Sequence, residues 1–173
     1  MNKLIALCFL CLVLAFSQSA MAEQVLSPIP PAYPLTEDVK AVLKVAAQEL
    51  GYTEGRDGST KYGQWYGDAK AEWCAEFLCW SVNQAQEELG EKLLEVRYPL
   101  YGATNIGRNW FLAQGRYIAR TGFIAGWGSQ WYIGDSNQME RNSYIPQPGD
   151  WVFFSYTPSG DTTHVALVEQ TLK

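Results

Sequence analysis

The sequence predicts an α+β fold in which helices come first along the chain and an antiparallel sheet comes last. Apolar residues recur at helical spacing over residues 37–50 and again over 72–89. Two short runs rich in Val, Phe and Leu, at 151–156 and 164–170, are typical of strands joined by a hairpin. We therefore expect N-terminal helices packed on a C-terminal antiparallel sheet.

The first segment has the features of a secretory leader. Lys3 supplies a positive charge, Leu4–Phe16 is an unbroken apolar run, and Ala20-Met21-Ala22 offers a small-residue cleavage site. The apolar run is shorter than the roughly 18–20 residues that cross a bilayer. We predict a cleaved signal peptide over residues 1–22, a secreted, periplasmic or cell-wall-associated protein, and no membrane association after cleavage.

The next segment, residues 23–35, contains "SPIPPAYP" and is expected to form an extended, Pro-rich linker. The folded domain is then predicted over residues 36–173. Thr36 fits the N-cap position of a helix. Two acidic residues follow it in the first turn, where the helix dipole is positive, and Gly51 ends the helical pattern.

The middle of the domain alternates loops and helices. We expect Gly51–Lys70, with its glycines and aromatics, to be a long loop. A helix over 72–89, ended by Gly90, is apolar over much of its surface and is expected to be central and largely buried. A third helix is predicted over 103–114. The apolar residues of 117–143 follow no sustained helical or strand spacing, so this segment is expected to form strand fragments and loops.

Composition excludes some functions and narrows others. The formal net charge is −5, so the chain has no electrostatic reason to bind nucleic acid. Removal of the leader would leave two cysteines, Cys74 and Cys79, and one histidine, His164. No group of residues has the spacing of a metal site, so we expect no metal and no cofactor, and a monomer.

The two cysteines fall within one predicted helix. A separation of five helical residues gives about 140° of rotation and roughly 8 Å of rise, which does not suit a disulfide. A thiolate is stabilised near a helix N-terminus and by a nearby histidine. Cys74 lies in the first turn and is the candidate nucleophile, whereas Cys79 is expected to be a packed hydrophobic residue. His164 is the candidate base.

Three quoted segments occur in an order that resembles a known family: "KYGQWYG", "AEWCAEFLCW" and "PQPGDWVFF…HVALVE". Together they resemble the CHAP family, the cysteine- and histidine-dependent amidohydrolase/peptidase domains of bacterial cell-wall enzymes. The resemblance runs from about Thr36 to Gln170. It implies a papain-like α+β fold, with Cys74 as nucleophile and His164 as base.

The resemblance also implies the reaction. A secreted cysteine hydrolase would cleave amide bonds in peptidoglycan peptides, as an N-acetylmuramoyl-L-alanine amidase or an endopeptidase, through a thioester acyl-enzyme. The turn Pro148-Gly149-Asp150 matches a structural turn of the family.

The chain departs from the family pattern after His164. Members usually orient the histidine with a Glu, Asn or Asp on the following strand, and here only nine residues follow, so we expect that strand to be missing. Three explanations stay open: a truncated chain, recruitment of another polar residue, or a weaker Cys–His dyad. Glu169 is on the other face of an ideal strand from His164 and is expected to point away. Glu76 stands where the family more often has a small or apolar residue, and is expected to face away from Cys74.

Two other functions stay open from sequence. The aromatic content and the missing third residue also suit a catalytically weak or inactive module that binds cell wall or glycan. The same Cys–His pair would equally suit an amidase or peptidase acting on a peptide from outside the wall.

Overall fold

The computed structural model describes residues 26–118, 122–124, 128–130, 144–157 and 161–173. The predicted signal peptide, residues 1–22, lies outside the described residues, as does most of 117–143. The helices are α1 (Glu37–Gln48), α2 (Lys61–Tyr66), α3 (Cys74–Leu89) and α4 (Thr104–Ala113). The strands are β1 (Pro28–Ile29), β2 (Gly122–Ile124), β3 (Gly128–Gln130), β4 (Trp151–Phe154), β5 (His164–Leu167) and β6 (Thr171–Leu172). The predicted α+β class is confirmed.

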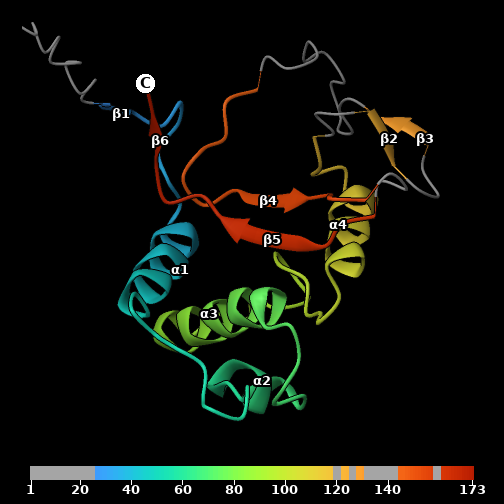
Figure 1. Ribbon diagram of the computed structural model, residues 1–173. Coiled ribbons are helices and arrows are strands. Elements are labelled where there is room, and N and C mark those ends of the chain that lie inside the picture. Colours follow the sequence, from blue (N-terminus) through green and yellow to red (C-terminus); the bar gives the residue numbers. More distant parts are fainter. Residues whose placement is uncertain (1–25, 119–121, 125–127, 131–143, 158–160) are drawn as a thin grey trace, which may run out of the picture.

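Helix α3 is the centre of the fold (Figure 1). It lies between the β4–β5 hairpin and α2, and α1 packs alongside it. Its buried side chains, which form much of the core, are Ala75, Glu76, Leu78, Cys79, Ser81, Val82 and Ala85. The expectation of a central, largely buried helix is therefore confirmed, and its N-terminal end faces strand β5.

The ends of α3 follow the sequence signals closely. The helix begins at Cys74, two residues later than predicted, because the chain leaves a turn in which the Ala71 N–H donates to the Asp68 carbonyl. Gly90 ends the helix with a φ of 68°, which favours glycine. Helices α1 and α4 likewise match the predicted 37–50 and 103–114.

One local prediction was wrong. Within the expected loop Gly51–Lys70, residues 61–66 form the short helix α2. The Thr60 hydroxyl accepts a hydrogen bond from the Gly63 N–H at 2.9 Å, and Gly67 ends the helix with a φ of 102°. Six residues are too few to show helical periodicity, so the capping threonine was the signal that could have revealed it.

The C-terminal hairpin has the predicted antiparallel form. Strand β4 pairs with β5, and Phe154 lies opposite His164. Before β4 the chain turns at Gly149, whose φ is 93°, and the Asp150 carboxylate accepts a hydrogen bond from the Gln147 N–H at 2.7 Å. A Cβ at Gly149 would lie 2.4 Å from a Val39 methyl carbon, so this turn fits closely against α1.

The two ends of the described chain meet. Within the segment predicted as a linker, residues 23–35, strand β1 pairs with β6 in an antiparallel sheet of its own. Ser27 and Lys173 exchange two backbone hydrogen bonds of 3.0 Å. The residues after β5 therefore form a strand, but it lies beside β1 and not in the hairpin. Within the described ranges, no helix is long and apolar enough to span a bilayer.

Candidate active site

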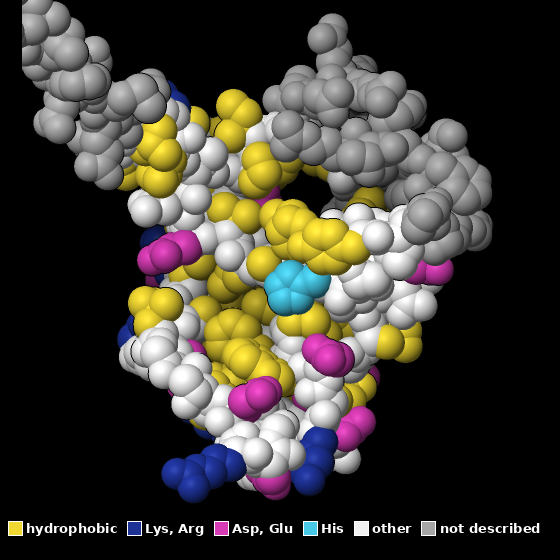
Figure 2. Space-filling view, viewed as in Figure 1, with side chains coloured by type: hydrophobic (Ala, Val, Ile, Leu, Met, Phe, Trp, Pro, Cys, Tyr) yellow, Lys and Arg dark blue, Asp and Glu magenta, His cyan; other side chains and the backbone are white. Residues whose placement is uncertain are grey.

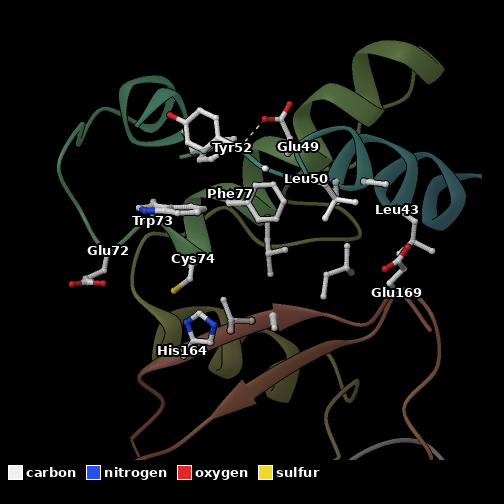
Figure 3. Close-up of a pocket in the computed structure, with 18 residues that line it drawn as sticks. Leu43, Glu49, Leu50, Tyr52, Glu72, Trp73, Cys74, Phe77, His164 and Glu169 are labelled. Carbon is white, nitrogen blue, oxygen red and sulfur yellow. Dashed lines mark hydrogen bonds between the residues drawn. The ribbon is translucent and has the colours of Figure 1, made fainter. Parts of the chain in front are cut away.

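Cys74 is the first residue of α3 and its side chain is half-buried. Figure 3 shows its Sγ pointing toward the imidazole ring of His164 across a groove. Trp73, the residue before the helix, makes no side-chain cap to the first-turn N–H groups. Such N–H groups are left without partners in the helix itself, so they are available to an anionic group beside the thiol.

His164 opens strand β5 and is exposed at the opposite wall of the groove. Its ring lies against that of Phe154, with 5.8 Å between the ring centroids. The Thr104 hydroxyl, at the start of α4, donates to the Thr162 carbonyl at 2.6 Å. This bond joins the segment before β5 to α4. It thereby helps to hold His164, two residues further on, in its position at the groove. Sequence reasoning missed Thr104, because nothing in the local pattern links it to residues 58 positions away.

The second cysteine has different surroundings. Cys79 is completely buried, and burial raises the pKa of its thiol to about 12. The Tyr101 N–H donates to the Cys79 Sγ, with 3.4 Å between nitrogen and sulfur. The thiol in turn donates to the Pro99 carbonyl, with 3.4 Å between sulfur and oxygen. Both cysteines are free. The expectation that Cys79 is a packed hydrophobic residue is confirmed.

The groove between Cys74 and His164 is a sizeable, mostly apolar space. Its volume is about 490 Å³. Figure 2 shows hydrophobic side chains gathered in a hollow beside the histidine. It is lined from α1 and the residues after it (Leu43, Ala46, Ala47, Glu49, Leu50, Gly51, Tyr52), from Tyr62, from the start of α3 (Glu72, Trp73, Cys74, Phe77, Leu78) and from the β5 side (His164, Val165, Ala166, Leu167, Glu169).

In the described part of the chain, no third group lies behind the histidine. Among the described residues, none hydrogen-bonds to the His164 ring, and Glu169 lies at the far end of the groove (Figure 3). Glu169 nevertheless lines the same groove as His164, so the expectation that it points away was wrong. Strand β5 ends at Leu167, and the two-residue alternation of side chains ends with it.

Glu76 takes no part in the groove. Its side chain is 1% exposed and is absent from the groove lining. A Cβ at Gly63 would lie 3.0 Å from Glu76 Oε2, an atom that has no hydrogen-bond partner in the described part of the chain. Burial raises the pKa of this carboxyl group, and the Asp68 carboxylate adds to the effect. Glu76 therefore faces away from Cys74, as expected.

The chemistry available in the groove is that of a thiol and an imidazole on facing walls. A thiol nucleophile with an imidazole base and nearby helix N–H groups is suited to attack on a carbonyl carbon. The described residues contain no group of three or more His, Cys, Asp or Glu side chains arranged to hold a metal ion.

Comparison with known proteins agrees with this arrangement. The model of the CHAP domain family matches residues 62–173, a range that includes both Cys74 and His164. No curated protein matches the chain significantly. No solved structure does so either. Because the family model covers more than half of the sequence, the chain belongs to the CHAP domain family.

Proposed function

We propose that this protein is a cysteine amidohydrolase or peptidase that cleaves amide bonds in peptidoglycan peptides. One observation carries the proposal: Cys74 and His164, ninety residues apart in the sequence, lie on facing walls of one groove with the thiol directed at the imidazole (Figure 3). Membership of the CHAP family supports an amidase or peptidase that acts on the cell wall.

The geometry supports a two-step reaction. His164 takes the proton of Cys74, and the thiolate attacks the amide carbonyl carbon. The N–H groups at the start of α3 stabilise the oxyanion that forms. His164 then gives the proton to the leaving amine, which leaves a thioester on Cys74. Water attacks the thioester, with His164 as base, and releases the acid.

Two wider features belong to the same proposal. A papain-like arrangement is supported by a nucleophile at the start of a central helix and a histidine on a strand packed against that helix. Export of the protein is supported by the leader-like pattern of residues 1–22. The leader-like pattern fits a substrate outside the cytoplasm.

The test measures new amino groups released from purified peptidoglycan. Wild-type protein should release them, and Cys74→Ala and His164→Ala should not. Cys79→Ala is the matched control, since it removes the same atom from the same helix outside the groove, and it should retain activity. Equal release by wild type, Cys74→Ala and His164→Ala would contradict the proposal.

A second candidate is a wall-binding module with little or no turnover. It is favoured by the lack of a hydrogen-bond partner for the His164 ring among the described residues. It predicts sedimentation of the protein with peptidoglycan, unchanged by Cys74→Ala, without release of amines. Hydrolysis of an unrelated peptide, with intact peptidoglycan untouched, would instead identify an amidase for another substrate.

A further inference from the structure

The groove extends well beyond Cys74 and His164. From this pair it continues between α1 and β5 toward Leu43 and Glu169 (Figure 3). The α1 side of the groove precedes residues 62–173 and so lies outside the segment that matches the family model. This part of the groove is therefore a feature of the present chain that the family assignment does not explain.

The side chains along this extension are aliphatic or aromatic. On the α1 side they include Leu43, Ala46 and Leu50, and the other sides include Phe77 and Leu167. Leu50 is 82% exposed, so most of its apolar surface is in contact with water. Covering that surface with an apolar group is favourable, because it removes the surface from water. A ligand with an aliphatic segment would make this contact.

The neutral polar side chains of the groove wall, apart from the Cys–His pair, already have partners within the protein. The Tyr52 hydroxyl accepts the backbone N–H of the first residue of α2 at 3.0 Å. The Tyr62 hydroxyl donates to Glu49 at 2.8 Å, and the Trp73 indole N–H donates to Glu54 at 3.4 Å. A ligand rich in polar groups finds few side-chain partners left here, whereas an alkyl chain needs none.

The remaining charged groups stand at the two ends of the groove. Glu72 lies next to Cys74, Glu169 lies at the distal end, and both are exposed (Figure 3). No Lys or Arg is among the described residues that line the groove. A negative charge at the far end of a ligand would be repelled there, so the groove favours a neutral chain.

The groove has room for a chain of moderate length. Its volume of about 490 Å³ is within the range of small-molecule sites. From His164 to Leu167 strand β5 advances roughly 10 Å, at about 3.3 Å per residue. With C–C bonds of about 1.5 Å, an extended chain of roughly eight carbons spans the same distance.

We propose that the groove between α1 and β5 holds an aliphatic acyl chain of about eight carbons, and that the protein hydrolyses amides of such acids. The acyl carbonyl carbon lies at Cys74, and the chain lies between Leu50 and Leu167. This inference goes beyond the proposed function in the class of substrate, but it rests on the same Cys–His pair.

The reaction needs water as its only co-reactant. The Cys74 thiolate attacks the acyl carbonyl carbon, a C–S bond forms, and the C–N bond breaks as His164 gives its proton to the amine. Water then attacks the thioester, which frees the fatty acid and restores the thiol. The ionised acid is repelled by the nearby Glu72 carboxylate, and this repulsion favours its release.

The test uses N-acyl-glycinamides in which the acyl group is acetyl, butanoyl, hexanoyl, octanoyl or dodecanoyl, each below its micelle concentration. Release of glycinamide gives kcat/KM for the wild type, and calorimetry gives the affinity of Cys74→Ala. We expect each added methylene to raise both quantities roughly 2- to 4-fold up to about eight carbons, without further gain beyond. A carboxylate at the far end of the octanoyl chain should cancel most of the gain.

Two substitutions in the groove should weaken the preference for long chains. Ala46→Phe fills part of the space and Leu50→Ser removes an apolar wall, so each should lower the octanoyl-to-acetyl ratio of kcat/KM several-fold. Ala113→Phe and Leu100→Ser are the matched controls. Both residues are exposed and lie outside the groove, so these variants should keep the wild-type ratio.

The inference would be overturned if neither kcat/KM nor affinity changed with chain length, or if Ala46→Phe and Ala113→Phe gave the same ratio. Chain-dependent binding to Cys74→Ala without release of glycinamide by the wild type would overturn the hydrolysis of acyl amides. Amine release from peptidoglycan without a chain-length preference would sink only this inference. Hydrolysis of acyl amides with peptidoglycan untouched would sink only the proposed function.

Discussion

Cys74 and Cys79 are five residues apart on the same helix, and their surroundings differ in every respect that governs thiol chemistry. Cys74 is half-buried at the first residue of α3, borders the groove and faces an imidazole. Cys79 is 0% exposed, one and a half turns further on, and contacts backbone groups of Pro99 and Tyr101. The residue type is the same, so position on the helix decides what each thiol can do.

The comparison shows how one helix serves two purposes. Its first turn is held at the edge of the core, where N–H groups and a side chain can meet a substrate. Its second turn is in the core, where burial favours the neutral thiol and raises the pKa of Cys79 to about 12. A thiol in that state is neither accessible nor ionised near neutral pH.

The largest expected effect comes from Cys74→Ser. The hydroxyl is similar in size but a far weaker nucleophile beside the same histidine, so hydrolysis should fall by roughly 10³-fold or more. The variant should keep the wild-type melting temperature to within a few degrees, because the side chain is only half-buried. The measurement is kcat/KM on soluble peptidoglycan fragments, with circular dichroism to confirm folding. Retained turnover would place the chemistry elsewhere.

The next effect concerns His164, which faces Cys74 across the groove and has no counterpart beside Cys79. Thr104→Val removes the hydroxyl that donates to the Thr162 carbonyl and so loosens the segment that leads into His164. Misplacement of a reacting group by about 1 Å can cost up to 10²-fold, and we expect kcat to fall about 10-fold with KM little changed. Thr104→Ser keeps the hydroxyl and should restore kcat. No restoration by serine would mean that this bond does not position the histidine.

The opposite pattern is expected at Cys79. Cys79→Ala leaves the groove intact, but it removes the sulfur that accepts from the Tyr101 N–H. The unpaired N–H and the small cavity should lower the free energy of unfolding by about 1–3 kcal/mol, with activity at the wild-type level below the melting transition. Urea denaturation against Cys74→Ala measures the difference. Greater destabilisation by Cys74→Ala would reverse the roles assigned to the two cysteines.

A smaller effect is expected at Glu76, the buried carboxyl group between the two cysteines in sequence. Because its pKa is raised in the folded protein, its ionisation favours unfolding, so stability is fully present below the ordinary carboxyl pKa and declines as pH rises through the folded pKa. Glu76→Gln cannot ionise and should be more stable than wild type at pH 7, by about 1 kcal/mol.

Melting temperatures from pH 4 to pH 8 test this expectation. The advantage of Glu76→Gln should shrink toward the acid end, where Glu76 of the wild type is protonated. A difference that is constant with pH would mean that the effect does not come from ionisation. Glu91→Gln, which neutralises an exposed carboxylate just after the same helix, is the matched control and should change little.

The sequence predicted the helices and strands that have a clear periodicity, and it singled out Cys74 and His164, which the structure places on one groove. Helices α1, α3 and α4 and the β4–β5 hairpin follow from periodicity and from glycine at turns, and Cys74 followed from its place in a first helical turn. His164 followed as the one histidine in the sequence, on a predicted strand after the cysteine helix.

Other features depend on contacts that no local pattern encodes. Helix α2 is too short to show a period, and the pairing of β1 with β6 joins the two ends of the described chain through backbone hydrogen bonds. The position of Glu169 depends on where β5 ends, because alternation of side chains holds only within the strand. Thr104 acts through a carbonyl group 58 residues away.

The most direct test of the account is a titration of the active protein with iodoacetamide near neutral pH. Residual hydrolysis is measured at each step, and mass spectrometry gives the fraction of Cys74 and of Cys79 that is alkylated. We predict that activity falls in proportion to the alkylation of Cys74 and reaches zero when Cys74 is fully modified and Cys79 is unmodified. Full activity with Cys74 completely alkylated, or a loss that follows Cys79, would contradict the account.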